Sequence, residues 1–543
     1  MTAENPADDA PDGSHGEPSD QPTTHHRDAI AEDARALMAE LERVHPTPYR
    51  GRDGRLDLHR RLERTIQDLP ESATTEQVYR ELAPLVAGLE DGHSLLVPPE
   101  LRDPTDLQRL PISVRVVGDQ LRVEAVYEPS LDALLGRRIV EIEGLSVNTL
   151  ADQAGRFRGA ENRPAALAYL CQAVATVRPF ARYLDVDGPI RDVTVGVGDP
   201  GDERTVSLAP VGRHHDAHRE LRSTVERPSG SGPRFQLYED GQAALFDPGA
   251  LEGYREVVES VRHNDADIAE QVARQAHERL VKGETPADLD AVVEALPSVT
   301  ETSIDLVEAM ATANTEVLVV DLRNNPGGGS QYVDILTYAL YGWEGVAEAA
   351  PAGAAVRRRS EPHRQHYGET GGSGTADDNP ANYEFRGDHT GFDTDPATRL
   401  EHIRERMRRA DTFARAADQG THEGFYTPDQ VIVVTTERTQ SSGFAGVAQL
   451  SLLGADVVGV APGQAPTSFG EPVERPLPNS DLTARITGAM FQWHPYVADD
   501  VLRPDRELTP ALFDRYDHAG DAALRLAFDH AGVTNDGDPP TPD

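Results

Sequence analysis

The sequence predicts an α/β protein with several domains, and three observations support this fold class. The chain has 543 residues, of which 38% are hydrophobic, so at roughly 150 residues per domain it can form three or four units with sizeable cores. Apolar residues recur at helical spacing near the N-terminus and alternate at strand spacing after it. From about residue 235 strands and helices alternate, which is typical of a buried parallel sheet covered by helices.

The N-terminal part is predicted to be a tail followed by a helical unit. Residues 1–26 are acidic and polar and are expected to be a disordered tail, as are residues 531–543. Within 27–100, apolar residues fall at helical spacing over 30–41 and again over 78–89. Gly92 breaks this periodicity and marks a turn.

Residues 101–208 are predicted to form a β module. Apolar residues alternate over 112–116 and over 121–125, on either side of a Gly-Asp turn, which predicts a hairpin. A helix and a strand over 131–150 would close a small PDZ-like module, and strands are expected near 181–208. Residues 209–233 are polar and are expected to be a loop.

The α/β core is predicted to lie in two parts, 235–354 and 429–530, separated by a polar insertion over 355–428. Long helical segments are expected around 249–280 and 286–314, and buried strands at 243–246, 316–321, 431–435 and 456–460. A helix over 442–453 joins the last two strands into a βαβ unit.

The charge of the chain excludes several classes of function. It carries 92 acidic residues against 52 basic ones, a net charge of −40 at pH 7, so nucleic acid is not an expected partner. No apolar run is long enough for a membrane span and the acidic N-terminus does not look like a secretory signal, so we expect no membrane partner and a cytoplasmic location. The acidic excess, with arginine used almost throughout in place of lysine, indicates halophilic adaptation; the alternative is an acidic surface without that adaptation. The single cysteine, Cys171, excludes an internal disulfide and is expected to be a buried apolar residue.

Three segments could carry chemistry. The segment 321–329 reads Asp-Leu-Arg-Asn-Asn-Pro-Gly-Gly-Gly after a buried strand, where glycines let backbone N–H groups turn toward a ligand. Ser441 and Ser442 lie at a strand-to-helix junction, which suits either an exposed nucleophile or a helix N-cap. His93 lies in an Asp-Gly-His-Ser turn; such a histidine is more often solvated, but a serine nucleophile needs a base of this kind.

Together these segments resemble a known superfamily. The Asp-Gly-His-Ser turn, a Leu-Gly…Ile-Glu-Gly stretch over 135–144, the 321–328 segment and the Thr-Gln-Ser-Ser-Gly turn over 439–443 occur in the order found in tail-specific (C-terminal processing) serine peptidases, tricorn-core peptidases and interphotoreceptor retinoid-binding protein. The sequence is most similar to stand-alone members with a histidine-containing motif, over residues 27–515 apart from the insertion. The resemblance implies a crotonase-like ββα spiral core and cleavage of peptide or protein substrates by acyl transfer, without a metal or other cofactor.

The resemblance also implies roles for individual residues. Ser441 matches the nucleophile, with Ser442 as the alternative, and the oxyanion would be held by the backbone N–H groups of Ser442 and of Gly327 or Gly328. Tail-specific members use a lysine base in the region that here reads Gly-Gln-Ala-Pro-Thr-Ser-Phe-Gly over 463–470.

Since the single lysine, Lys282, lies far from that region in sequence, His93 is the implied base. The carboxylate that orients it is expected close to the family's Pro-Asp signature at Pro504-Asp505, where Asp499 and Asp500 both fall and Asp499 is chosen. The alternative is that this Asp-Asp pair lies in a solvated acidic loop.

The sequence departs from the family at two positions. Phe444 stands three positions after Ser441, where many members carry an acidic residue, and Gly92 precedes His93 where the tricorn site has a serine. A catalytically inactive ligand- or peptide-binding protein with the same fold is the alternative function. An acyl-CoA enzyme on the related spiral fold is a third.

Overall fold

The computed structural model describes residues 23–49, 54–99, 108–186, 190–199, 201–212, 215–230, 232–249, 251, 253–264, 266–281, 283–352, 354–367, 396–420, 424 and 426–533. Most of both tails expected from the sequence, the middle of the 355–428 insertion and Lys282 lie outside these residues. The α/β multidomain fold class predicted from the sequence is confirmed. None of the helices within the described residues is long and apolar enough to cross a membrane.

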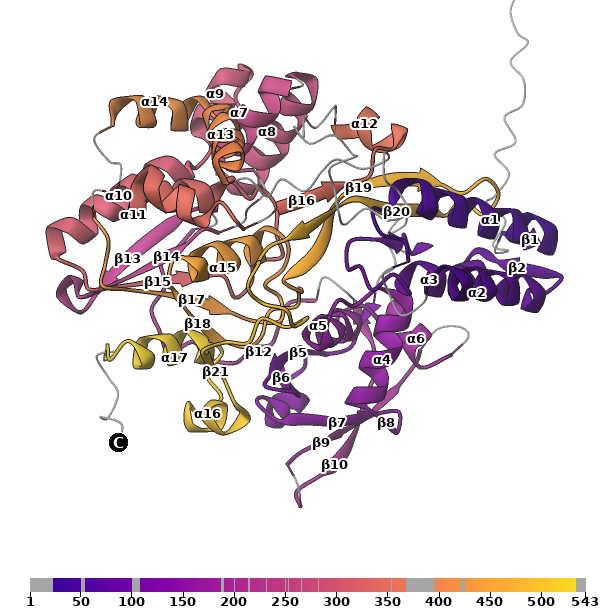
Figure 1. Cartoon of the computed structure of the whole chain (residues 1–543). Coiled ribbons are helices and arrows are strands. Elements are labelled where there is room, and N and C mark those ends of the chain that lie inside the picture. The colour runs from indigo at the N-terminus through magenta and orange to yellow at the C-terminus, as the bar shows by residue number, and fades with distance from the viewer. Residues whose placement is uncertain are drawn as a thin grey trace, which may run out of the picture.

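The N-terminal unit consists of three helices and a two-stranded sheet (Figure 1). Its helices bury the apolar faces expected from their spacing, with Ile30 and Leu37 fully buried on the first helix and Val78 and Leu82 on the third. The chain then turns at Gly88 and enters the loop that carries His93. The elements are β1 (Thr24–His26), α1 (Arg27–Val44), α2 (Arg55–Asp68), β2 (Ser72–Thr74) and α3 (Thr75–Ala87).

The β module is a seven-stranded antiparallel sheet with the main strand order β10-β9-β7-β6-β12, and β5 and β8 pair with β6 and β7. Its strands are β5 (Ile112–Val117), β6 (Gln120–Val126), β7 (Arg138–Ile142), β8 (Leu145–Ser146), β9 (Val193–Val197), β10 (Arg204–Leu208) and β12 (Arg219–Glu220). Its helices are α4 (Val147–Phe157), α5 (Arg163–Val174) and α6 (Val177–Tyr183), and β4 (Gln108–Arg109) pairs with β11 (Val211–Gly212).

The sequence does not predict α5 and predicts strands from about residue 181, whereas α6 ends at Tyr183 and β9 starts at Val193. The physical reason is that α5 is buried on nearly all sides, so it has no polar face and no helical periodicity in hydropathy. Cys171 lies buried in this helix as a free thiol, which confirms its predicted environment.

The core is a six-stranded sheet in the order β13-β14-β15-β17-β18-β21, in which all pairs except β13–β14 are parallel. Alternate residues of the fully buried β15 face two different hydrophobic clusters. Val317 and Val319 pack into the cluster that includes α17, while Leu318 and Val320 pack into the one beneath α10, α11 and α15. The strands are β13 (Arg234–Tyr238), β14 (Ala243–Asp247), β15 (Val317–Asp321), β17 (Gln430–Thr435), β18 (Asp456–Gly459) and β21 (Arg506–Glu507), and the helices are α10 (Val299–Ala313), α11 (Gln331–Ala349), α15 (Ser442–Leu452) and α17 (Ala522–His530).

A second sheet joins the core to the N-terminal unit (Figure 1). Its long hairpin, β19 (Thr467–Pro476) and β20 (Thr483–Gln492), extends from the core toward α1. On the edge of β20 that faces away from β19, the start of the strand pairs with β3 (Leu95–Leu96), just after His93, and its end pairs with β16 (Ala354–Arg357). The sequence does not predict this hairpin, because Gly470 and Pro472 interrupt the alternation of apolar residues in β19. The remaining helices are α7 (Arg255–Asn264), α8 (Ala266–Leu280), α9 (Leu289–Ala295), α12 (Glu361–Tyr367), α13 (Pro396–Arg408), α14 (Asp411–Gln419) and α16 (Pro510–Arg515).

Candidate active site

A cavity of about 970 Å³ lies where the core meets the N-terminal unit and the β module. His93, Gly327, Gly328, Ser441 and Ser442 all line it, although His93 is separated from the others by much of the chain. Gln464, from the loop between β18 and β19, lines it as well. The structure thus brings the predicted nucleophile, base and oxyanion donors to one cavity.

Ser441 stands at the junction between the loop after β17 and helix α15, in a strained backbone conformation. Its φ is 51° and its ψ −123°, which is rare for a residue with a side chain. It occupies the N-cap position without making a side-chain capping bond, and its Oγ has no hydrogen-bond partner among the described residues. Ser442, in contrast, is buried, and its Oγ donates to the carbonyl oxygen of Gly328 at 2.5 Å. Of the two serines, Ser441 therefore has the hydroxyl that is free to react.

The glycine turn packs directly against Ser441. Gly327 and Gly328 have φ values of 114° and 136°, and a Cβ placed on Gly327 would lie 2.5 Å from Cβ of Ser441. The Gly327 N–H donates to Oδ1 of Asn325 at 3.2 Å. Within the described residues, the N–H groups of Gly328 and Ser442 have no acceptor, so these two remain available for an oxyanion.

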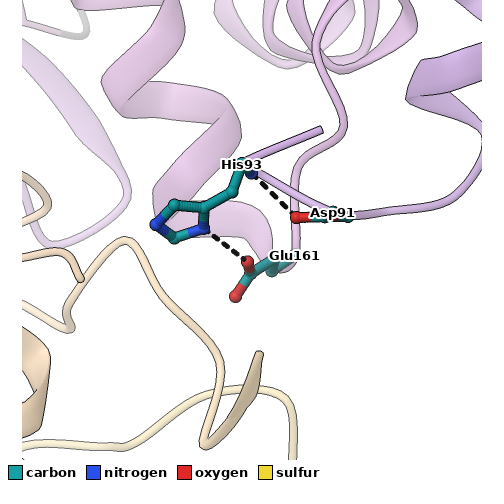
Figure 2. A group of neighbouring side chains, drawn as sticks. All are labelled: Asp91, His93 and Glu161. Atoms are coloured by element: carbon teal, nitrogen blue, oxygen red, sulfur yellow. Dashed lines mark hydrogen bonds and ion pairs between the residues drawn. The ribbon is translucent and has the colours of Figure 1, made fainter. Parts of the chain in front are cut away.

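His93 is held at its backbone and faces a carboxylate with its ring (Figure 2). Its backbone N–H donates to Oδ1 of Asp91 at 2.8 Å, and its Nδ1 lies 3.9 Å from Oε1 of Glu161. This Nδ1 is buried and has no hydrogen-bond partner among the described residues. Figure 2 shows the other ring nitrogen directed away from Glu161, so one nitrogen faces a carboxylate and the other is left for a reaction partner.

The carboxylate of Asp91 is fully buried beneath His93 and is fixed by distant groups. Its Oδ2 accepts from Nε2 of His45 at 3.3 Å and from Oγ1 of Thr487 at 2.6 Å. Burial alone would raise the pKa of Asp91, but the hydrogen bond from His45 is the largest of the interactions that oppose it, and the pKa is lowered to about 2. Since Nδ1 of His45 accepts from the N–H of Thr47, its Nε2 carries the proton given to Asp91.

Glu161 is the residue of this site that the sequence analysis missed. It lies in the loop before α5, with its side chain 5% exposed, and accepts from the N–H of Gly92, the N–H of Ala465 and the hydroxyl of Ser468. It therefore ties the loop of His93 to the loop that carries Gln464. No motif in the sequence marks this position, since its partners are 69 and more residues away.

The side chains of Asp91, His93 and Glu161 also have the composition of a small metal site, with ligand atoms within 4.8 Å of one another. The carboxylate oxygens, however, already accept hydrogen bonds from the backbone and from His45, Thr487 and Ser468. A metal ion would have to displace several of these bonds. The arrangement fits the positioning of an imidazole better than the binding of a cation.

Asp499, the predicted orienting carboxylate, lies elsewhere. Its side chain is 63% exposed, its ion pair is with Arg503 at 3.9 Å, and it is not among the residues that line the cavity. The neighbouring Asp500 contributes a backbone carbonyl oxygen, which accepts from Nδ2 of Asn162 at 3.1 Å. Phe444 is fully buried in α15.

The chain shares its overall fold with solved structures. It is similar to mature CPAF complexed with lactacystin, with a TM-score of 0.54 and 14% identity over 92% of this chain and 97% of that one. It is equally similar to mature CPAF on its own, with a TM-score of 0.53 and 15% identity over 94% and 99% of the two chains.

The photosystem II D1 C-terminal processing protease aligns over 90% of this chain and 94% of its own, at 12% identity and a TM-score of 0.37. No family model and no curated protein matches the sequence.

Proposed function

We propose that this protein is a serine peptidase that cleaves peptide bonds by acyl transfer, with Ser441 as nucleophile and His93 as base. The observation that supports it best is the free Ser441 hydroxyl on a strained strand-to-helix turn, in one cavity with His93 and two unpaired backbone N–H groups. The similarity of the fold to tail-specific proteases supports the same class.

The first chemical step is the attack of Oγ of Ser441 on the scissile carbonyl carbon. His93 takes the hydroxyl proton on Nε2, and the carbonyl oxygen becomes an anion that accepts from the N–H groups of Gly328 and Ser442. The intermediate then collapses, the C–N bond breaks, and His93 returns the proton to the leaving amine. Water attacks the acyl-enzyme by the same route and releases the second product.

Glu161 takes the orienting role that the sequence analysis gave to Asp499. It faces Nδ1 of His93, so it favours the tautomer with the proton on Nδ1 and stabilises the imidazolium that forms during attack. The separation of 3.9 Å exceeds a hydrogen bond, and we expect it to shorten when substrate fills the cavity.

A fluorophosphonate probe tests the proposal. We expect labelling of the folded wild-type protein in molar KCl, loss of labelling in Ser441→Ala, and retained labelling in Ser442→Ala. Absence of labelling in the folded wild-type protein would support the alternative of a catalytically inactive binding protein with the same fold.

A further inference from the structure

The side-chain amide of Gln464 is buried at the candidate active site, and its NH₂ group has no hydrogen-bond partner among the described residues. Gln464 lines the cavity from the loop between β18 and β19, and it is only 2% exposed. Buried amide donors are nearly always paired in folded proteins, so an unpaired one beside a cavity indicates a partner that arrives with the ligand.

The other end of the same amide is bound to the nucleophile. Oε1 of Gln464 accepts the backbone N–H of Ser441, the residue whose φ is positive. This bond fixes which end of the amide is the acceptor, because an N–H group cannot donate to Nε2. The NH₂ group is bonded to the same carbon atom as that oxygen, so it is held next to Ser441.

The loop around Gln464 is fastened on both sides. The N–H of Ala465 donates to Oε2 of Glu161 at 3.0 Å, and Nδ2 of Asn162 donates to the carbonyl oxygen of Pro462 at 3.3 Å. Gly463 lets this loop approach the core closely, because a Cβ there would lie 2.3 Å from the carbonyl oxygen of Glu437. The amide of Gln464 is thus positioned before any substrate binds.

We propose that Gln464 is a catalytic residue that donates a hydrogen bond from Nε2 to the substrate's carbonyl oxygen, while its Oε1 positions Ser441. This inference rests on the proposed function. When the Oγ–C bond forms and the proton of Ser441 moves to His93, the electron pair of the C=O bond goes to oxygen. The N–H groups of Gly328 and Ser442 stabilise that charge from one side, and Gln464 supplies a third donor.

Two variants separate the two ends of the amide. Gln464→Glu keeps an oxygen acceptor for the Ser441 N–H but removes the donor, and Gln464→Met removes both at similar volume. The matched control is Gln430→Met, at the start of β17, whose amide pairs with Asp456 and which does not line the cavity. Each protein is treated with a fluorophosphonate probe over a range of concentrations, which yields the maximal labelling rate and the half-saturating concentration separately.

We expect the maximal labelling rate to fall roughly 100-fold in Gln464→Glu, at a little-changed half-saturating concentration and melting temperature. Gln464→Met should lose at least as much, and Gln430→Met should label at the wild-type rate. If wild type is labelled at Ser441 and Gln464→Glu is labelled equally fast, the donor role is wrong while the proposed function stands. If folded wild type is not labelled at all, the proposed function fails and this inference fails with it.

Discussion

Ser441 and His93 line the same cavity but are held there in different ways. Ser441 is fixed by its own surroundings in the core: a buried parallel strand, a strained turn, and the glycine turn of the neighbouring strand. His93 lies in a loop whose conformation depends on the buried carboxylate of Asp91. That carboxylate is held by His45 and Thr487, 46 and 396 residues away in sequence.

Because of this difference, the two halves of the site should be sensitive to different kinds of change. The proposed nucleophile, Ser441, depends on backbone geometry, so we expect it to be sensitive to added atoms at the glycine turn. The proposed base, His93, depends on buried charges and hydrogen bonds, so we expect it to be sensitive to protonation and to the loss of partners. Five predictions test this contrast.

The largest effect is expected from removing the base. His93→Ala should lower the rate of fluorophosphonate labelling roughly 1,000-fold, since general base catalysis contributes about 100- to 10,000-fold. The melting temperature should change little, because the ring makes no hydrogen bond within the described residues. Labelling at the wild-type rate in this variant would contradict the assignment of His93 as the base.

The next effect concerns the glycine turn. Gly327→Ala would place a Cβ 2.5 Å from Cβ of Ser441, at a φ of 114°, and we expect a loss of roughly 100-fold in labelling rate through misplacement of the nucleophile. Gly454→Ala is the control, because that glycine also has a positive φ (90°) but nothing within 4 Å of an added Cβ. Equal losses in the two variants would mean that backbone strain alone, and not contact with Ser441, is responsible.

Protonation of Asp91 should destabilise the half of the site that carries His93. The pKa of about 2 in the folded state lies below the ordinary value of 3.8, so the stabilisation is complete above about pH 5 and is lost as pH falls toward 2. It amounts to about 2 kcal/mol of unfolding free energy.

Denaturant unfolding of wild type and Asp91→Asn measures this contribution. We expect the variant to be less stable by about 2 kcal/mol near neutral pH, and the difference to shrink as the pH is lowered. A difference that is independent of pH would contradict the role of the ionised carboxylate.

A smaller effect on the labelling rate should distinguish the two carboxylates that could orient His93. Glu161→Gln should lower the labelling rate roughly 10-fold, because the imidazolium loses the charge that faces it. Asp499→Asn should leave the rate unchanged, since this side chain is largely exposed. The opposite result would return the orienting role to Asp499.

The smallest effect is expected from salt. A net charge of −40 repels itself in dilute buffer, and the screening length falls to about 3 Å at 1 M salt. The melting temperature of wild type, followed by circular dichroism, should therefore rise by at least several degrees between dilute and molar KCl. A flat or falling melting temperature would reject halophilic adaptation. The effect of Gly327→Ala on labelling should be the same at both salt concentrations, because it is steric.

The local sequence was sufficient to predict where the loops that carry the proposed nucleophile lie. The apolar strands before residues 321 and 436, the glycine run and the paired serines predicted a reactive turn at the carboxyl edge of a parallel sheet, and these loops do meet there. The choice between Ser441 and Ser442 stayed open, because only the folded chain shows that the Ser442 hydroxyl is already bonded to Gly328.

The α/β class, the buried strands, the acidic surface and the order of the loops that line the cavity could all be predicted from the sequence. This was possible because composition, periodicity and glycine content are read from the chain without knowledge of its tertiary contacts. Only the tertiary structure decided what surrounds His93 and Ser441. Glu161, Thr487 and Gln464 belong to no recognisable motif, and they reach the site through a helix buried on nearly all sides and an interrupted hairpin. Contacts between residues tens to hundreds of positions apart depend on how the whole chain packs, which local patterns do not specify.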